Sequence, residues 1–123
     1  MVDATEERCV LVGVISQNVT EEEAYEYIDE LDFLARTAGA FNERTFLQKL
    51  PYPDPRTFVG SGKLEEIRNY IQSEGIELVI FDDELSPAQL RNIEKELECK
   101  VLQHRKILHL LRYTDQQNPL RLP

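Results

Sequence analysis

Apolar runs and helical patterns alternate along the chain and divide it into strands and helices. Residues 8–15 and 78–81 are almost continuously apolar and rich in β-branched side chains, which is typical of strands buried on both faces of a parallel sheet. A looser alternation predicts a further strand over residues 43–48, and a short apolar segment predicts a last strand over residues 100–102. Residues 57–60 are expected to form a short extended piece.

Three segments between these strands carry apolar residues at helical spacing. The first begins after Thr20 and ends before Gly39, the second spans residues 63–73, and the third runs from Ser86 to about Glu98. Thr20 and Ser86 each stand three residues before a Glu or Gln, the pattern of a capping box. Strands that alternate with helices predict an α/β fold: a three-layer domain with a mostly parallel four-stranded sheet and helices on both faces.

The domain organisation follows from the length and from a change of pattern near the end. A chain of 123 residues fits one compact domain, which is predicted over residues 1–102, with the proline-rich residues 51–55 as a loop inside it. Residues 103–123 form an atypical basic C-terminal tail, expected to be helical or disordered. Its apolar residues 107–111 allow an extra helix or a weak homodimer.

The charge of the chain limits its partners. The formal net charge is −9, whereas the last 23 residues hold four basic side chains and one acidic one. An acidic body argues against broad nucleic-acid binding, because phosphate neutralisation needs clustered Lys and Arg. Any RNA contact is therefore expected to be local. The sequence has no long apolar run and no signal-peptide pattern, so a cytoplasmic protein without a membrane partner is expected.

The segment from Gly60 to Lys63 (GSGK) invites a phosphate-binding interpretation. It would place backbone N–H groups and a lysine at the start of a helix, which suits an anion. A full P-loop also needs a glycine at the position of Thr57 and a Ser or Thr at the position of Leu64, so the signature fails twice. Three interpretations stay open: a glycine turn with a solvated lysine, a contact with RNA phosphate, and a nucleotide site.

Acidic residues follow the second buried strand, at Asp82, Asp83 and Glu84. The carboxyl ends of parallel strands are where open α/β sheets place ligand sites, and clustered carboxylates there are suited to magnesium. They are equally suited to a solvated turn before the helix that begins near Ser86. Without a nearby histidine or phosphate loop, the structural role is favoured and no metal site is predicted. Arg91 is expected to pair with one of these carboxylates or to contact a partner.

Two dense segments carry a family resemblance. They are residues 54–66 (DPRTFVGSGKLEE) and residues 81–95 (FDDELSPAQLRNIEK). Together with residues 10–14 and 37–40, they resemble the N-terminal domain of the HflX family of ribosome-associated GTPases. The resemblance covers roughly residues 8–102. After residue 102 the family pattern is lost, which predicts a truncated or frame-disrupted product.

The resemblance implies a role and a set of partners. HflX proteins bind the large ribosomal subunit and its RNA, while GTP and magnesium bind a downstream G domain, so this chain is expected to hold no cofactor, no catalytic residue and no GTPase activity. Alternatives are an ATP-binding domain that uses the Gly60–Lys63 turn and a remnant without independent activity. The candidates for contact with ribosome, RNA or phosphate are Arg56, Gly60, Ser61, Gly62, Lys63 and Arg91, and the other motif residues are Asp54, Thr57, Asp82, Asp83, Glu84, Ser86, Gln89 and Asn92.

Overall fold

The computed structural model describes residues 7–113 and contains four strands and four helices in that range. The strands are β1 (Glu7–Ile15), β2 (Ala40–Lys49), β3 (Leu78–Phe81) and β4 (Lys100–Gln103), and the helices are α1 (Glu21–Thr37), α2 (Ser61–Glu74), α3 (Pro87–Leu97) and α4 (His104–Tyr113). The strands form one sheet in the order β2-β1-β3-β4, and every neighbouring pair is parallel. The predicted α/β fold is confirmed.

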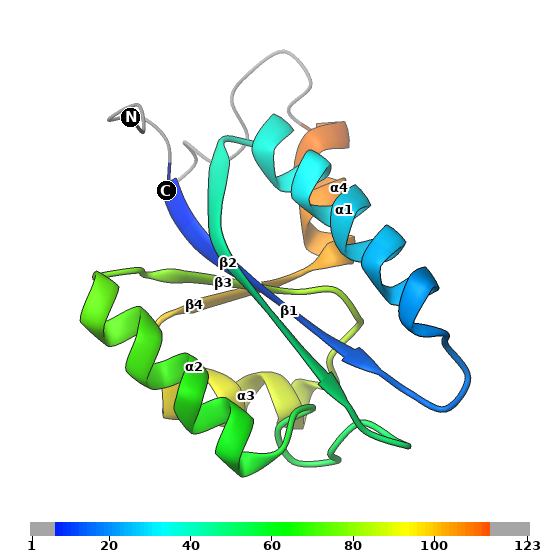
Figure 1. Cartoon of the computed structure of the whole chain (residues 1–123). Helices are drawn as coiled ribbons and strands as arrows, with labels where there is room; N and C mark the ends of the chain where they lie inside the picture. Colours follow the sequence, from blue (N-terminus) through cyan, green and yellow to red (C-terminus); the bar gives the residue numbers. More distant parts are fainter. Residues whose placement is uncertain (1–6, 114–123) are drawn as a thin grey trace.

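The sheet separates two helical layers (Figure 1). Helices α1 and α4 cover one face, and α2 and α3 cover the other. Because side chains alternate along a strand, Val10 and Val12 of β1 enter the core beneath α2 and α3, whereas Cys9 and Leu11 enter the core beneath α1 and α4. All four side chains are fully buried, as the continuous apolar run predicted for a strand covered on both faces.

The predicted helix starts are confirmed where a polar side chain caps the helix. Thr20 accepts a hydrogen bond from the N–H of Glu23, and the Glu23 carboxylate accepts one from the N–H of Thr20. Ser86 and Gln89 form the same reciprocal pair at α3. Helix α2 has no such side chain, because Gly60 is its N-cap. It therefore begins at residue 61, two residues before the predicted start.

Residues 57–60 do not form the short extended piece predicted from the sequence. Phe58 has a φ of +67°, a left-handed conformation that is strained for a bulky residue. The chain turns sharply there, since the N–H of Val59 donates to the carbonyl of Thr57 at 2.6 Å. The Phe58 ring is nevertheless buried, at 3% exposure, and packs edge-on against the ring of Phe81. Burial of the ring holds the backbone in this turn.

Two other boundaries differ from the prediction. Strand β2 runs from Ala40 to Lys49, because it pairs with β1 along the whole of that strand. The predicted tail begins with Gln103, the last residue of β4, and continues as the helix α4, whose Ile107 is fully buried against the α1 side of the core, while Leu108 is exposed. Residues 114–123 of the tail lie outside the described residues. No helix between residues 7 and 113 is long and apolar enough to cross a membrane.

Candidate functional site

The loop before α2 is built around Asp54. Its carboxylate oxygen Oδ1 accepts hydrogen bonds from the backbone N–H groups of Arg56 at 2.8 Å and Thr57 at 3.1 Å. Asp54 and Phe58 also exchange a pair of backbone hydrogen bonds. The Thr57 hydroxyl, which is buried, donates to the carbonyl of Val59 at 2.8 Å. These bonds give the loop a defined shape, so Asp54 and Thr57 act as structural residues of the motif.

The two segments that carried the family resemblance are joined in the structure. Gln89 Nε2 on α3 donates to the carbonyl of Asp54 at 2.8 Å, and Asn92 Nδ2 donates to the carbonyl of Arg56 at 3.0 Å. On the other side of the loop, the Gln48 side chain of β2 accepts a hydrogen bond from the N–H of Gly60 at 2.8 Å. The loop is therefore clamped between α3 and β2. Contacts between residues 35 positions apart left no local signal in the sequence.

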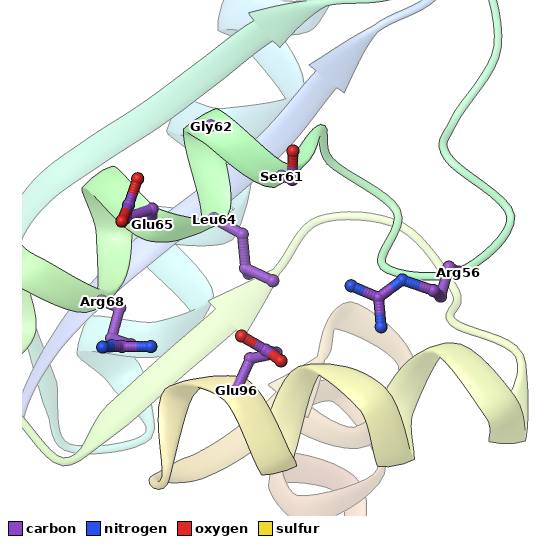
Figure 2. A pocket seen from close by; sticks show the side chains of 7 residues that line it. All are labelled: Arg56, Ser61, Gly62, Leu64, Glu65, Arg68 and Glu96. Atoms are coloured by element: carbon purple, nitrogen blue, oxygen red, sulfur yellow. The ribbon is translucent and has the colours of Figure 1, made fainter.

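A cleft of about 260 Å³ lies between the start of α2 and the side of α3. Figure 2 shows Leu64 of α2 and Glu96 of α3 pointing toward each other across it. Arg56 extends into the cleft from the loop, and Arg68 lies on the opposite side, further along α2. In this view the oxygens of Ser61 and Glu65 point away from the centre of the cleft, whereas the Glu96 carboxylate points into it. The lining residues are Arg56, Ser61, Gly62, Leu64, Glu65, Arg68 and Glu96.

The charged groups of this cleft are not neutralised by ion pairs. Within residues 7–113, neither Arg56 nor Arg68 makes an ion pair, and neither does Glu96. The Nε atom of Arg68 is buried and has no hydrogen-bond partner among the described residues. A buried donor without a partner is costly. The cleft is therefore lined by positively charged donors and a negatively charged acceptor that form no ion pair with other described residues.

The structure separates the sequence-predicted contact residues into two groups. Arg56, Ser61 and Gly62 line the cleft, but Lys63 does not. Its ammonium group forms an ion pair with Glu66 one turn along α2, at 3.0 Å. Arg91 is exposed on α3, outside the cleft, and makes no ion pair with another described residue. It does not pair with the carboxylates that follow β3, which was one of its two expected roles.

The two glycines of the GSGK segment have different surroundings. A Cβ atom on Gly60 would lie 3.3 Å from Gln48 Nε2, which is tighter than most such contacts. A Cβ atom on Gly62 would meet nothing within 4 Å. A side chain at residue 60 would therefore push the end of Gln48 aside by a few tenths of an ångström, whereas Gly62 leaves open space at the start of α2.

The acidic residues after β3 form a separate, smaller site. Asp82 and Asp83 line a pocket of about 50 Å³ at the carboxyl ends of β1 and β3. His104, the first residue of α4, places Nδ1 3.9 Å from Asp82 Oδ1, so the expectation that no histidine is nearby was wrong. Burial, followed by the charge of Asp83, raises the pKa of Asp82 to about 6, and His104 partly offsets this rise. The described residues contain no group of three metal-binding side chains.

The comparisons with known proteins decide the family. A family model described as GTP-binding GTPase N-terminal matches residues 25–110. The chain belongs to this family. It is 48% identical over 96 residues to the GTPase HflX of Flavobacterium psychrophilum, covering 78% of this chain and 23% of that protein. It is 35% identical over 96 residues to the GTPase HflX of Escherichia coli, covering 78% and 22%. The expected HflX-type N-terminal domain is confirmed.

Solved structures agree with this assignment. A variant of the protein SsGBP matches with a TM-score of 0.60 and 26% identity, over 83% of this chain and 31% of that chain. A GTP-binding protein of the archaeon Sulfolobus solfataricus in complex with GDP matches with a TM-score of 0.57 and 25% identity, over 83% and 29%. The chain spans about a quarter of the length of its curated HflX relatives. The family match contains both motif segments and extends into α4.

Proposed function

We propose that this chain is the ribosome-facing part of an HflX-type GTP-binding protein and contacts RNA of the large ribosomal subunit in the cytoplasm. In this proposal GTP and magnesium bind elsewhere in the whole protein, and residues 1–123 alone do not hydrolyse GTP. Membership of the HflX-type family supports the proposal.

One observation carries the RNA-facing role: the two motif segments clamp each other and fix the backbone of Arg56, whose exposed side chain lines the cleft beside the start of α2. The first N–H groups of a helix have no partner within the helix and attract anions. An arginine held beside them adds a planar charged donor that matches a phosphate group. The loop therefore presents a local phosphate-binding surface.

The arrangement of charge makes a local contact possible on an acidic protein. The acidic helix α1, with three glutamates in its first turn, lies on the opposite face of the sheet from α2 and α3 (Figure 1). Arg56 and Arg68 lie on the α2–α3 side. At physiological ionic strength the Debye length is about 8 Å, so the charge of α1 is largely screened at the loop.

Binding of the 123-residue chain to purified large subunits tests the proposal. We expect weak co-sedimentation at low salt, and we expect Arg56→Ala to reduce the association constant about tenfold, as loss of a well-placed charged contact does. Arg36→Ala is the matched control, because Arg36 is an exposed arginine on α1. Equal binding by wild type and Arg56→Ala, or no binding at low salt, would contradict the proposal. GTP hydrolysis by the chain would contradict its second part.

A further inference from the structure

We propose that the cleft between α2 and α3 receives a single unpaired nucleotide of RNA. Its phosphate binds Arg56 and the start of α2, and an amino group on its base donates to the Glu96 carboxylate. This inference rests on the proposed function and deepens it, because it names the group that the RNA-facing surface recognises.

The size and walls of the cleft suit one nucleotide. Its volume is about 260 Å³, close to the lower end of small-ligand pockets. Leu64 supplies an apolar wall on α2, and Glu96 faces it from α3 (Figure 2). RNA is recognised by sequence mainly where unpaired bases are splayed out and placed against side chains. A base in the cleft would lie against the Leu64 side chain on one side and α3 on the other.

The mixed charge of the cleft distinguishes a nucleotide from a simple anion. A phosphate ion would satisfy Arg56 but would leave the carboxylate of Glu96 facing an anion. A nucleotide carries acceptor oxygens on its phosphate and N–H donors on its base, so it matches both side chains. An ionised carboxylate only accepts hydrogen bonds. Adenine and cytosine present an amino group that can donate to it, whereas uracil presents a carbonyl oxygen at the corresponding position. The N3–H donor of uracil lies between two carbonyl oxygens, which repel an approaching carboxylate.

Arg68 supplies a third contact at the far side of the cleft. Its Nε–H is buried and has no partner in the described part of the chain. A planar guanidinium in this position can stack on a base or donate to an acceptor on its edge. Because the Nε atom is buried, a bound base would contact the terminal Nη groups of Arg68, which lies on the far side of the cleft.

Fluorescence anisotropy with labelled, 5′-phosphorylated oligo(A), oligo(C) and oligo(U) tests the inference on the 123-residue chain. Wild type is expected to bind oligo(A) and oligo(C) about tenfold more tightly than oligo(U), the discrimination of one good hydrogen-bonded contact to a base. Glu96→Gln replaces the carboxylate with an amide that can also donate to uracil. It is expected to abolish the preference while changing the mean affinity little. Arg56→Ala is expected to weaken all three by the same factor.

Glu94→Gln is the matched control, since Glu94 is exposed on the same helix and does not line the cleft. Circular dichroism checks that each variant is folded. If the chain binds large subunits but binds the oligonucleotides without a preference that Glu96→Gln removes, the inference is wrong and the proposed function stands. If the chain binds neither subunits nor oligonucleotides, both are wrong.

Discussion

Asp82 is mostly buried, although its acidic sequence neighbours indicate an exposed turn. The run from Asp82 to Glu84 reads as a solvated acidic turn. In the structure Glu84 is exposed and pairs with Arg105 at 3.2 Å, but the Asp82 side chain is only 14% exposed. The helix that brings His104 to Asp82 was predicted from the sequence as part of a tail outside the family pattern, whereas the family match extends to residue 110. The acidic pattern is local, whereas burial depends on how α4 and α1 pack over the end of β3.

The raised pKa of Asp82 makes the stability of the domain depend on pH. The pKa in the folded state is about 6, above the ordinary value of 3.8, so between these values the folded state binds more protons than the unfolded state. The free energy of unfolding therefore falls as pH rises through this window. We expect Asp82→Asn to be more stable than wild type by about 1–3 kcal/mol above pH 7. The difference is expected to vanish below about pH 3, where Asp82 is protonated in both states.

Urea unfolding of wild type and Asp82→Asn across this pH range measures the difference directly. Glu84→Gln is the control, because this exposed carboxylate belongs to a surface ion pair, and such pairs change stability by less than about 1 kcal/mol. A variant Asp82→Asn that is less stable than wild type above pH 7 would show that the carboxylate is stabilised, not penalised, by its surroundings.

At the scale of elements, the sequence predicts those that carry their own start signals and misses those that depend on distant partners. Helices α1 and α3 begin where the capping boxes of Thr20 and Ser86 place them. Helix α2 begins two residues before the predicted start. Its N-cap, Gly60, has no capping side chain, and its N–H donates to Gln48 of β2, a partner 12 residues away. The clamp between the loop and α3 joins residues 35 and 36 positions apart, and a pattern of apolar and polar residues does not reveal such a pairing. Of the candidate site, the two segments and Arg56, Ser61 and Gly62 were named from the sequence, but the cleft and the places of Arg68 and Glu96 in it were not.

The clamp on the loop can be tested separately from the integrity of α3. Gln89 has two roles: its Oε1 atom completes the capping box with Ser86, and its Nε2 atom donates to the carbonyl of Asp54. Gln89→Glu keeps the capping oxygen and removes the donor to the loop. We expect it to lower the free energy of unfolding by about 1–3 kcal/mol, because the Asp54 carbonyl loses its donor and faces a carboxylate oxygen instead. Gln89→Ala adds no such repulsion but also loses the capping box, and it is expected to cost about 1–2 kcal/mol.

Hydrogen exchange locates these effects. In Gln89→Glu the N–H groups of Asp54 and Phe58, which bond each other across the loop, are expected to exchange faster, while those of α3 keep their protection. In Gln89→Ala both sets are expected to exchange faster. Equal exchange at the loop in wild type and Gln89→Glu would mean that the bonds of Asp54 hold the loop without help from α3.

At the scale of the whole molecule, the proposed contact of an acidic protein with RNA through one loop predicts a distinct salt dependence. The net charge is −9, and the proposed contact surface contributes few cations, so binding neutralises about two or three phosphates and the slope of log K against log salt is expected to be about −2. Arg56→Ala is expected to reduce the magnitude of this slope by about one. Arg36→Ala on the far face should leave it unchanged. Filter binding of oligo(A) over a series of salt concentrations measures all three slopes. A slope several times steeper would mean that RNA contacts a broad basic surface, which would contradict a contact through one loop. Helix α1 does not provide such a surface, because its first turn carries three glutamates.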